Sequence, residues 1–562
     1  MSSNKSMQSL NSLNEKVRDS IPCRIEFIKD LLRGKKLDPL VDFDNTDTEY
    51  FMPHGKEENA SGESYDTRIV LKKRQLDFLN IIAQIGGKLR YVKSGTTGHT
   101  FKGQSVDNFG SFEYAIKVVA FPKKERYGPI TDTRRPENAE IMMIKLLSYF
   151  IAKKQTPHIV LPIGTFNTDI TTFVDLIESN VVAKDNEKYA EFVEKYKNGE
   201  FHEDVSILIS EWANRGDLLD FIRKYHTVFT PVHWKVMFFQ VLSVLAVIQS
   251  KYPAFRHNDM KANNVLVHKI VKKNDTFSYR VAKCEYKVPN IGYYVKLWDF
   301  DFACIPGIVD NKKVESDWTK QINVTPIQNR YYDIHYFFNT LIKRGFCPEI
   351  MTNKQTPQEL KDFINRIVPE KYQKTGTKYV HKKGRLLVND EYLTADDILK
   401  FDPYFEEYRV KKNSSTQAQV HTQVHTQAHT QNAGQPKLRK SLSKDNINEN
   451  VKPMSVPKSK PKISNMPDLT KFLKSSSEEE KPKKVVKRKV EKSSKDNLQL
   501  NELIRGYSNE KVKDKQKVKP KSVKPTKKST KKGKDKLRSR TISEEVRNLD
   551  PDIILNYTTS SD

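Results

Sequence analysis

The stretch F-R-H-N-D-M-K-A-N-N-V-L-V, Phe255 to Val267, decides the fold of this chain. Its polar residues lie between an apolar helical run and an apolar strand-like run, and their types suit phosphoryl transfer. Asp259 can accept the proton of an incoming hydroxyl, Lys261 can neutralise phosphate charge, and Asn264 can hold a metal ion together with a second carboxylate. The block alone also fits a polar surface turn, so the rest of the chain must decide between the two interpretations.

The second carboxylate is expected at Asp299, in Y-V-K-L-W-D-F-D-F-A, Tyr294 to Ala303. Asp299 ends a strand-like run, so its side chain can face the same cleft as Asn264. Mg²⁺ prefers one or two carboxylates together with phosphate oxygens. Asn264 and Asp299 therefore predict a magnesium site.

A phosphate-binding turn is expected in K-L-R-Y-V-K-S-G-T-T-G-H-T-F-K-G, residues 88–103. Gly95, Gly98 and Gly103 lie between two strand-like runs, and glycine lets the main chain approach phosphates closely. Any surface hairpin would show a similar pattern, so this turn needs support from elsewhere in the chain.

That support comes from Lys117, which lies in the apolar run A-I-K-V-V. A lysine in a half-buried strand needs an anionic partner, because an unpaired buried ammonium group is costly. Glu140 is the candidate partner, at the edge of a helical pattern from Asn138 to Phe150. Taken alone, Glu140 also fits a solvated surface charge.

Hydrophobic periodicity predicts the other elements. We expect helices within Ile25–Leu32, Val70–Ile85 and Trp234–Gln249, a strand over His158–Ile163, and a strand, polar link and helix over Ser206–Tyr225. The charged segment Asn180–Asp204 is most simply a solvated insertion.

The composition changes abruptly after Lys411. Residues 411–562 hold 37 lysine and arginine residues against 17 aspartate and glutamate residues, which is most of the net charge of +28. This tail is rich in Lys, Ser and Pro, cannot bury enough apolar area to fold, and is expected to be disordered. Its lysine clusters suit nucleic-acid backbones or an acidic partner, or they simply solubilise the chain.

The four cysteines, Cys23, Cys284, Cys304 and Cys347, are far apart and show no C-x-x-C spacing. This pattern argues against a disulfide framework or a zinc site. We see no signal-peptide core and no run of apolar residues as long as a membrane helix requires. An intracellular location, without membrane attachment, is therefore expected.

The ordered set G-T-T-G, A-I-K, a helical Glu, H-N-D-M-K-A-N-N and D-F-D resembles the signatures of the eukaryotic-type protein kinases over residues 88–408. The resemblance implies an α+β, two-lobed kinase fold with a small antiparallel β lobe carrying one main helix and a larger, mainly helical lobe. The implied organisation is a polar extension over 1–65, a kinase domain over 66–408 with insertions near 168–204 and 269–292, and a disordered basic tail over 411–562.

The resemblance also implies a role for each matching residue. Asp259 matches the catalytic base, Lys261 the lysine typical of Ser/Thr-directed members, and Asn264 and Asp299 the metal ligands. The implied ATP-binding set consists of Val92, Lys93, Ser94, Gly95, Thr96, Thr97, Gly98, His99, Thr100, Lys117, Glu140, Glu211, Ala213 and Asp217. Within it, Lys117 would contact the α- and β-phosphates, and Glu211 to Ala213 would receive adenine. Asp333 resembles the buried aspartate that braces the catalytic loop.

Three positions depart from the kinase pattern. Lys93 stands in place of the first loop glycine, Asn258 in place of the arginine of H-R-D, and Asp301 in place of the glycine of D-F-G. Without that arginine, activation by phosphorylation of the activation loop is in doubt, and Asp301 adds a carboxylate near the expected metal site. No A-P-E motif precedes Asp333.

The D-F-D motif and N-R-Y-Y-D-I-H-Y-F-F-N-T-L, residues 329–341, look like the divergent Ser/Thr kinases of large DNA viruses, especially iridoviruses. The resemblance implies an ATP- and Mg²⁺-dependent kinase that acts on serine or threonine of proteins in an infected cell. The locations it implies are the host cytoplasm or nucleus and the virion. The alternatives are a pseudokinase scaffold, motivated by the three departures, and a nucleic-acid or virion-binding protein that acts through its tail.

Overall fold

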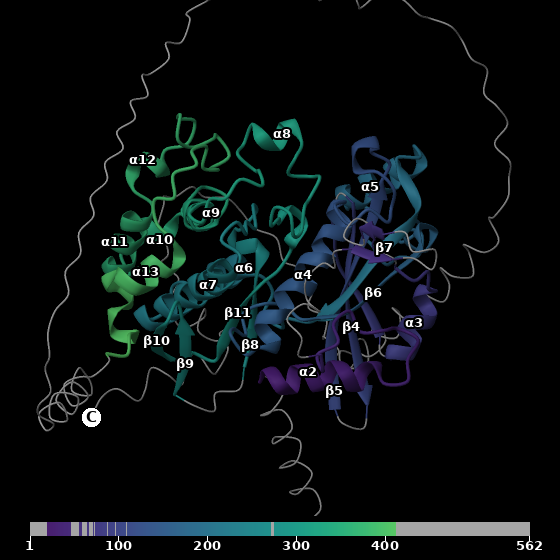
Figure 1. The fold of residues 1–562 in the computed structure, drawn as a ribbon, viewed down its shortest axis with the longest axis horizontal. Helices are drawn as coiled ribbons and strands as arrows, with labels where there is room; N and C mark the ends of the chain where they lie inside the picture. Colours follow the sequence, from purple (N-terminus) through teal and green to yellow (C-terminus); the bar gives the residue numbers. More distant parts are fainter. Residues whose placement is uncertain are drawn as a thin grey trace, which may run out of the picture. The chain divides into compact units, whose positions relative to one another are not determined.

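The computed structural model describes residues 20–45, 56–58, 64–66, 71, 73–86, 88–95, 97–107, 110–270 and 275–411 (Figure 1). Its strands are β1 (Lys56–Glu58), β2 (Ser64–Asp66), β3 (Lys88–Ser94), β4 (Gly98–Asp107), β5 (Gly110–Pro122), β6 (Pro162–Asp169), β7 (Phe201–Glu211), β8 (Val265–Lys269), β9 (Thr276–Val281), β10 (Cys284–Pro289) and β11 (Tyr293–Leu297). Its α-helices are α2 (Ile21–Leu32), α3 (Phe78–Ile85), α4 (Pro136–Ala152), α5 (Glu187–Lys197), α6 (Leu218–Tyr225), α7 (Pro231–Lys251), α8 (Asp317–Lys320), α9 (Tyr332–Leu341), α10 (Glu349–Thr352), α11 (Gln358–Ile367), α12 (Glu370–Gln373) and α13 (Ala395–Phe401). The expected mixture of an antiparallel sheet and many helices is confirmed.

The largest sheet has the strand order β3-β4-β5-β7-β6, and all its neighbouring strands are antiparallel. Two of the glycines are required by packing within this sheet. A Cβ atom on Gly98 would lie 1.8 Å from the carbonyl oxygen of Val118, and one on Gly103 would lie 2.1 Å from the ring of Tyr114. The glycines that predicted a phosphate turn therefore also serve the close approach of β4 to β5.

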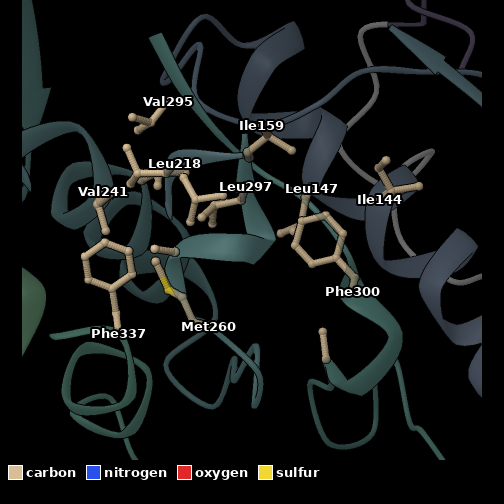
Figure 2. Packing of buried hydrophobic residues seen from close by; sticks show 14 of the residues in the cluster. Ile144, Leu147, Ile159, Leu218, Val241, Met260, Val295, Leu297, Phe300 and Phe337 are labelled. Atoms are coloured by element: carbon tan, nitrogen blue, oxygen red, sulfur yellow. The ribbon is translucent and has the colours of Figure 1, made fainter. Parts of the chain in front are cut away.

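Helix α4 packs between this sheet and the helices that follow it (Figure 1). Pro136 occupies its first turn, where a missing N–H costs nothing, and almost all of its residues are buried. Figure 2 shows Ile144 and Leu147 of α4 in one cluster with Leu297 of β11 and Phe300. Phe300 directly follows Asp299, so the apolar core fixes the backbone that carries this candidate metal ligand.

Helix α7 is the apolar core helix expected from the sequence. Contrary to the expectation from the sequence, it is long and apolar enough to cross a membrane by length and composition, but nearly all of it is buried inside the protein. Such burial is typical of a core helix, with Thr230 and His233 forming a capping box at its start. Met260, which follows Asp259, joins the same core (Figure 2).

The segment expected to be a polar extension packs onto the fold. Ser20 caps α2, and Ile28, Leu31, Leu32 and Leu37 are buried in the core. The expected domain boundary at residue 66 therefore does not separate residues 20–45 from the fold. The polar composition of residues 1–65 led to the expectation of an extension outside the fold. Helix α2 nevertheless packs on the core, because a single apolar stripe along a helix is enough for this contact.

Both insertions also contribute to the core. In the first, Tyr189 and Phe192 of α5 are buried, so this charged segment is not merely a solvated face. In the second, β9 and β10 pair as a hairpin whose Tyr279 and Tyr286 pack on Phe239 of α7, with ring centroids 5.1 and 5.2 Å apart respectively. The tail beyond residue 411 lies outside the described residues, so its expected disorder stays a prediction.

Candidate active site

Residues 252–264 connect α7 to β8 and form what we call the Asp259 loop. Within it, the Asp259 carboxylate is buried, and its Oδ2 accepts hydrogen bonds from Lys261 Nζ and Asn264 Nδ2, each at 2.9 Å. Strand β8 pairs with β11, and Trp298 N–H donates to the carbonyl of Asn264 at 3.3 Å. This ladder places Asp299, the next residue, beside the Asp259 loop.

Asp333 braces the Asp259 loop, as its sequence context predicted. It is fully buried in α9 and accepts hydrogen bonds from the backbone N–H groups of His257 at 2.7 Å and Asn258 at 2.9 Å. His257 also donates through Nε2–H to the carbonyl of Trp298 at 3.0 Å. The Asp259 loop is thus tied both to α9 and to the backbone before Asp299.

Lys117, Glu140 and Asp299 form a second group, which we call the Lys117 cluster. Lys117 Nζ lies 2.6 Å from Glu140 Oε1 and 2.7 Å from Asp299 Oδ1, so the ion pair with Glu140 expected from the sequence is present. The residues come from β5, α4 and the segment after β11. One ammonium group therefore joins the sheet, the helix and the candidate metal ligand.

The charges of the Lys117 cluster shift one another. Burial alone would lower the pKa of Lys117, but Asp299 and Glu140 raise it well above its ordinary value. Burial would raise the pKa of Asp299, but Lys117 holds it below its ordinary value. Lys117 lowers the pKa of Glu140, but burial and the negative charge of Asp299 raise it more, so the pKa of Glu140 is about 7. A single lysine thus neutralises one carboxylate fully and the other only in part.

The glycine turn is closed by a hydrogen bond from Gly95 N–H to the carbonyl of Gly98 at 2.7 Å. Around it, Ser94 pairs with His99 and Lys93 with Thr100 across the hairpin, while Thr96 lies outside the described residues. Val92 and Lys93 of β3 are exposed and Ser94 is half-buried, and the carbonyl of Thr97 accepts a hydrogen bond from the N–H of Ala120 at 2.7 Å.

The His99 side chain does not belong to the phosphate-binding set. It is buried, with its ring centroid 4.5 Å from that of Phe192 in α5 and 5.3 Å from that of Tyr189. Burial lowers the pKa of His99 to about 3, so the ring is neutral. Side chains alternate between the two faces of a strand, and the His99 side chain lies on the face that contacts the aromatic residues of the first insertion. This contact was not expected from the sequence.

In the expected adenine-binding segment, the Glu211 side chain has partners inside the fold. The Glu211 carboxylate is buried and pairs with Arg24 of α2 and with Lys296 at 3.0 Å, and it accepts from Leu161 N–H at 2.8 Å. Burial alone would raise the pKa of Glu211, but Arg24 and Lys296 lower it to about 2. The side chain is therefore used inside the fold. Ala213 is buried beside it.

Asp217 is the N-cap of α6, since its Oδ1 accepts from the N–H of Asp220 at 3.0 Å. The kinase resemblance places Asp217 in the ATP-binding set. The structure supplies the capping role, which uses one carboxylate oxygen.

The departures at Asn258 and Asp301 have structural partners. Asn258 has φ of 62°, a left-handed conformation that asparagine tolerates, and its Nδ2 donates to the carbonyl of Phe302 at 3.1 Å and that of Thr325 at 3.4 Å. Asp301 forms an ion pair with Lys313, so its carboxylate is partly neutralised rather than free beside Asp299. Both contacts secure the segment that follows Asp299.

Two arginines important to this region were missed by sequence reasoning. Arg256 is fully buried and donates to Thr325 Oγ1 at 3.1 Å and to the carbonyls of Ile327 and Asn323 at 2.9 and 2.5 Å. Arg385 donates to Asp259 Oδ1 at 2.5 Å. Arg256 was visible in the opening stretch as a charge among buried residues, whereas Arg385 carries no sequence signal because it lies far along the chain.

Known proteins resemble this chain in sequence. A profile of the poxvirus serine/threonine protein kinase family matches residues 128–394. The putative serine/threonine-protein kinase R400 of Acanthamoeba polyphaga mimivirus is 48% identical over 392 residues, which cover 69% of this chain and 80% of that protein. Serine/threonine-protein kinase 2 of fowlpox virus is 27% identical over 253 residues, 44% of this chain and 50% of that protein.

These relatives come from mimivirus and a poxvirus, so the iridovirus part of the sequence resemblance stays a prediction. The Asp259 loop, Glu140 and Asp299 lie within the residues matched by the family, while Lys117 precedes them. Because 48% of the 392 residues aligned with the putative mimivirus kinase are identical, and these cover 80% of that protein, the chain belongs to the divergent viral serine/threonine protein kinases.

Proposed function

We propose that this kinase transfers the γ-phosphoryl group of ATP, with the help of Mg²⁺, to serine or threonine hydroxyls of proteins. The observation that carries the proposal is the contact of Lys117 Nζ with both Glu140 and Asp299, beside a loop in which Asp259 is held by Lys261 and Asn264. Phosphoryl transfer depends on positioning and charge stabilisation more than on covalent chemistry by the protein, and these residues supply both.

In this proposal the five-stranded sheet with α4 is the smaller lobe and the helices around α7 belong to the larger one. Lys117 binds the α- and β-phosphates, and the turn at Gly95 and Gly98 covers them. Asp259 orients the attacking hydroxyl and accepts its proton, and Lys261 stabilises the charge of the transferred group. The backbone near Ala213 receives adenine.

Asn264 and Asp299 fit a magnesium ion. Asn264 turns its amide nitrogen toward the Asp259 carboxylate, which leaves its amide oxygen for a metal, and the Asp299 side chain is 37% exposed with one oxygen engaged by Lys117. Mg²⁺ is commonly held by one or two protein oxygens and completed by phosphate and water oxygens. Asn264 and Asp299 would hold such an ion, which would supply positive charge against the negative charge that develops on the transferred phosphoryl group.

The test uses the full chain, labelled ATP, Mg²⁺ and a protein substrate such as casein. Asp259→Asn and Lys117→Met should each lower phosphate incorporation by at least about 100-fold, because each removes a charge that acts on the reacting groups. Asp30→Asn and Lys374→Met alter exposed charges on distant helices and should behave as wild type.

Each result of this comparison has a definite meaning. Equal incorporation by all variants would show a contaminating kinase and remove the catalytic claim. ATP binding by a purified wild-type chain that transfers no phosphate to any substrate would favour the pseudokinase scaffold.

A further inference from the structure

Arg385 is brought to the centre of the active site by a short turn far along the chain. Val380 and Leu386 form a β-bridge, His381 and Arg385 are joined by a backbone hydrogen bond of 2.8 Å, and Gly384 adopts φ of 81°. The left-handed glycine permits the tight turn that presents the arginine. In addition, Asn339 Nδ2 of α9 donates to the carbonyl of Gly384 at 3.1 Å, which ties the turn to the fold.

The guanidinium group of Arg385 is buried and has several partners. Its Nη2 donates to Asp259 Oδ1 at 2.5 Å, and its Nη1 donates to the carbonyl of Asn258 and to Tyr332 Oη, the latter at 3.2 Å. Its centre lies 4.2 Å from the ring centroid of Tyr336. A planar guanidinium held on two edges and one face has little freedom left, so its position is well defined.

We propose that Arg385 is a positioning residue that fixes the carboxylate of Asp259 for phosphoryl transfer. This inference rests on the proposed function. Lys261 and Asn264 hold Oδ2, and Arg385 holds Oδ1, so donors on both oxygens prevent rotation of the carboxylate plane. A carboxylate oxygen accepts more than one hydrogen bond, so Oδ1 keeps a lone pair for the substrate hydroxyl.

A cation beside the base is compatible with phosphoryl transfer. The transition state of phosphoryl transfer is loose, and the aspartate chiefly orients the attacking hydroxyl. A fixed orientation of the Asp259 carboxylate therefore contributes more to the rate than a high basicity of that carboxylate. Arg385 also supplies positive charge to the Asp259 carboxylate. Lys117 does not supply it, because Lys117 is paired with Glu140 and Asp299. The buried arginine in turn requires the carboxylate, since an unpaired buried charge is costly.

The experiment measures kcat and the KM for ATP of the full chain with Arg385→Met, Arg385→Lys and Arg385→Ala, the last with and without added guanidinium. We expect Arg385→Met to lower kcat by about 10- to 100-fold, with KM for ATP changed by less than about 2-fold, because a misplaced catalytic group costs rate rather than nucleotide affinity. The kcat of Arg385→Lys should lie between the values of wild type and Arg385→Met, and added guanidinium should restore part of the kcat of Arg385→Ala.

Arg366→Met is the matched control, because Arg366 forms a two-bond pair with Asp402, at 3.0 and 2.7 Å, without contact to Asp259. It should keep the wild-type kcat. A folded Arg385→Met protein with wild-type or higher kcat would overturn the inference, as would a loss of kcat that follows the melting temperature and responds to neither lysine nor guanidinium. If Arg385→Met does not fold, Arg385→Lys decides by the same comparison of kcat and KM.

Asp259→Asn, measured in parallel, separates this inference from the proposed function. An inactive Asp259→Asn protein beside a fully active Arg385→Met protein would overturn only the role of Arg385. Equal activity of Asp259→Asn and wild type would overturn the proposed function and the role of Arg385 together.

Discussion

Glu140 and Asp299 compete for the single ammonium group of Lys117, and this competition has a consequence for stability. The pKa of Glu140 is raised to about 7 from an ordinary value of 4.5, so between these pH values the folded chain binds more protons than the unfolded chain. The contribution of Glu140 to folding therefore becomes less favourable as the pH rises from about 4.5 to 7.

Replacing Glu140 by glutamine should remove this pH dependence, because glutamine does not titrate. We predict that the free energy of unfolding of wild type, relative to Glu140→Gln, falls between about pH 5 and 7 by on the order of 1 kcal/mol per pH unit. Urea unfolding of both proteins without Mg²⁺ and nucleotide measures the difference, in which other titrating groups cancel. Parallel stability curves would contradict the pKa assigned to Glu140.

Asn258 is tested by two substitutions that differ only in backbone freedom. Alanine and glycine both remove the amide that bonds Phe302 and Thr325, but only glycine fits φ of 62° without strain. We predict that Asn258→Ala is less stable than Asn258→Gly by about 1 kcal/mol, measured by thermal or urea unfolding. If the alanine variant is the more stable one, the left-handed backbone at Asn258 is not required by the fold.

At the scale of elements, helix α2 adds a polar contact with β7 to the apolar residues that it buries in the core. Arg24 donates through Nε to Glu211 Oε2 at 2.9 Å and through Nη1 and Nη2 to the carbonyls of Pro157 and Ile159. We predict that Arg24→Met destabilises the chain by about 3 kcal/mol, because it leaves Glu211 with Lys296 alone in a buried site. We also expect a higher KM for ATP, since β7 leads into the proposed adenine-binding segment.

The control for Arg24→Met is Arg33→Met, directly after the last residue of the same helix. The pair of Arg33 with Asp30 is exposed and should contribute less than about 0.5 kcal/mol. Acid provides a second check. The pKa of Glu211 is lowered to about 2, so its stabilising effect is complete above about pH 4.5 and is lost as the pH falls toward 2. The difference between wild type and Arg24→Met should shrink over that range. A constant difference would mean that the Glu211 charge is not what α2 stabilises.

Elements whose residues are close in sequence could be predicted, and contacts between distant segments could not. The Asp259 loop and the pairing of Lys117 with Glu140 could be predicted because charged and polar residues are rare among apolar neighbours unless they have a partner or a function. The docking of α2 and the contact of Arg385 with Asp259 depend on tertiary packing, which no local pattern encodes. His99 was misassigned for the same reason, because its partners lie in the first insertion.

At the scale of the whole molecule, the described residues contain the candidate active site, while most of the net positive charge lies after residue 410. Residues 411–562 carry 37 lysine and arginine residues and 17 acidic ones, with lysine clusters at 481–489 and 511–536. Such clusters bind phosphate backbones by releasing counterions, which makes binding strongly dependent on salt. The tail and the active site are therefore expected to act independently, one in binding and the other in catalysis.

We predict that the full chain binds single-stranded and duplex DNA at low salt, and that its affinity falls by at least about 100-fold between 50 and 200 mM salt. Replacing the lysines of 511–536 by glutamine should weaken binding and flatten the salt dependence without changing kcat on a small peptide. Fluorescence anisotropy and peptide phosphorylation measure the two effects. The matched control compares seven of the thirteen lysines of 511–536 with the seven exposed lysines of residues 343–400, each set replaced by glutamine, and the second set should leave the affinity nearly unchanged. Absence of binding even at low salt, or equal weakening by both sets of substitutions, would show that the basic tail is not a nucleic-acid-binding segment.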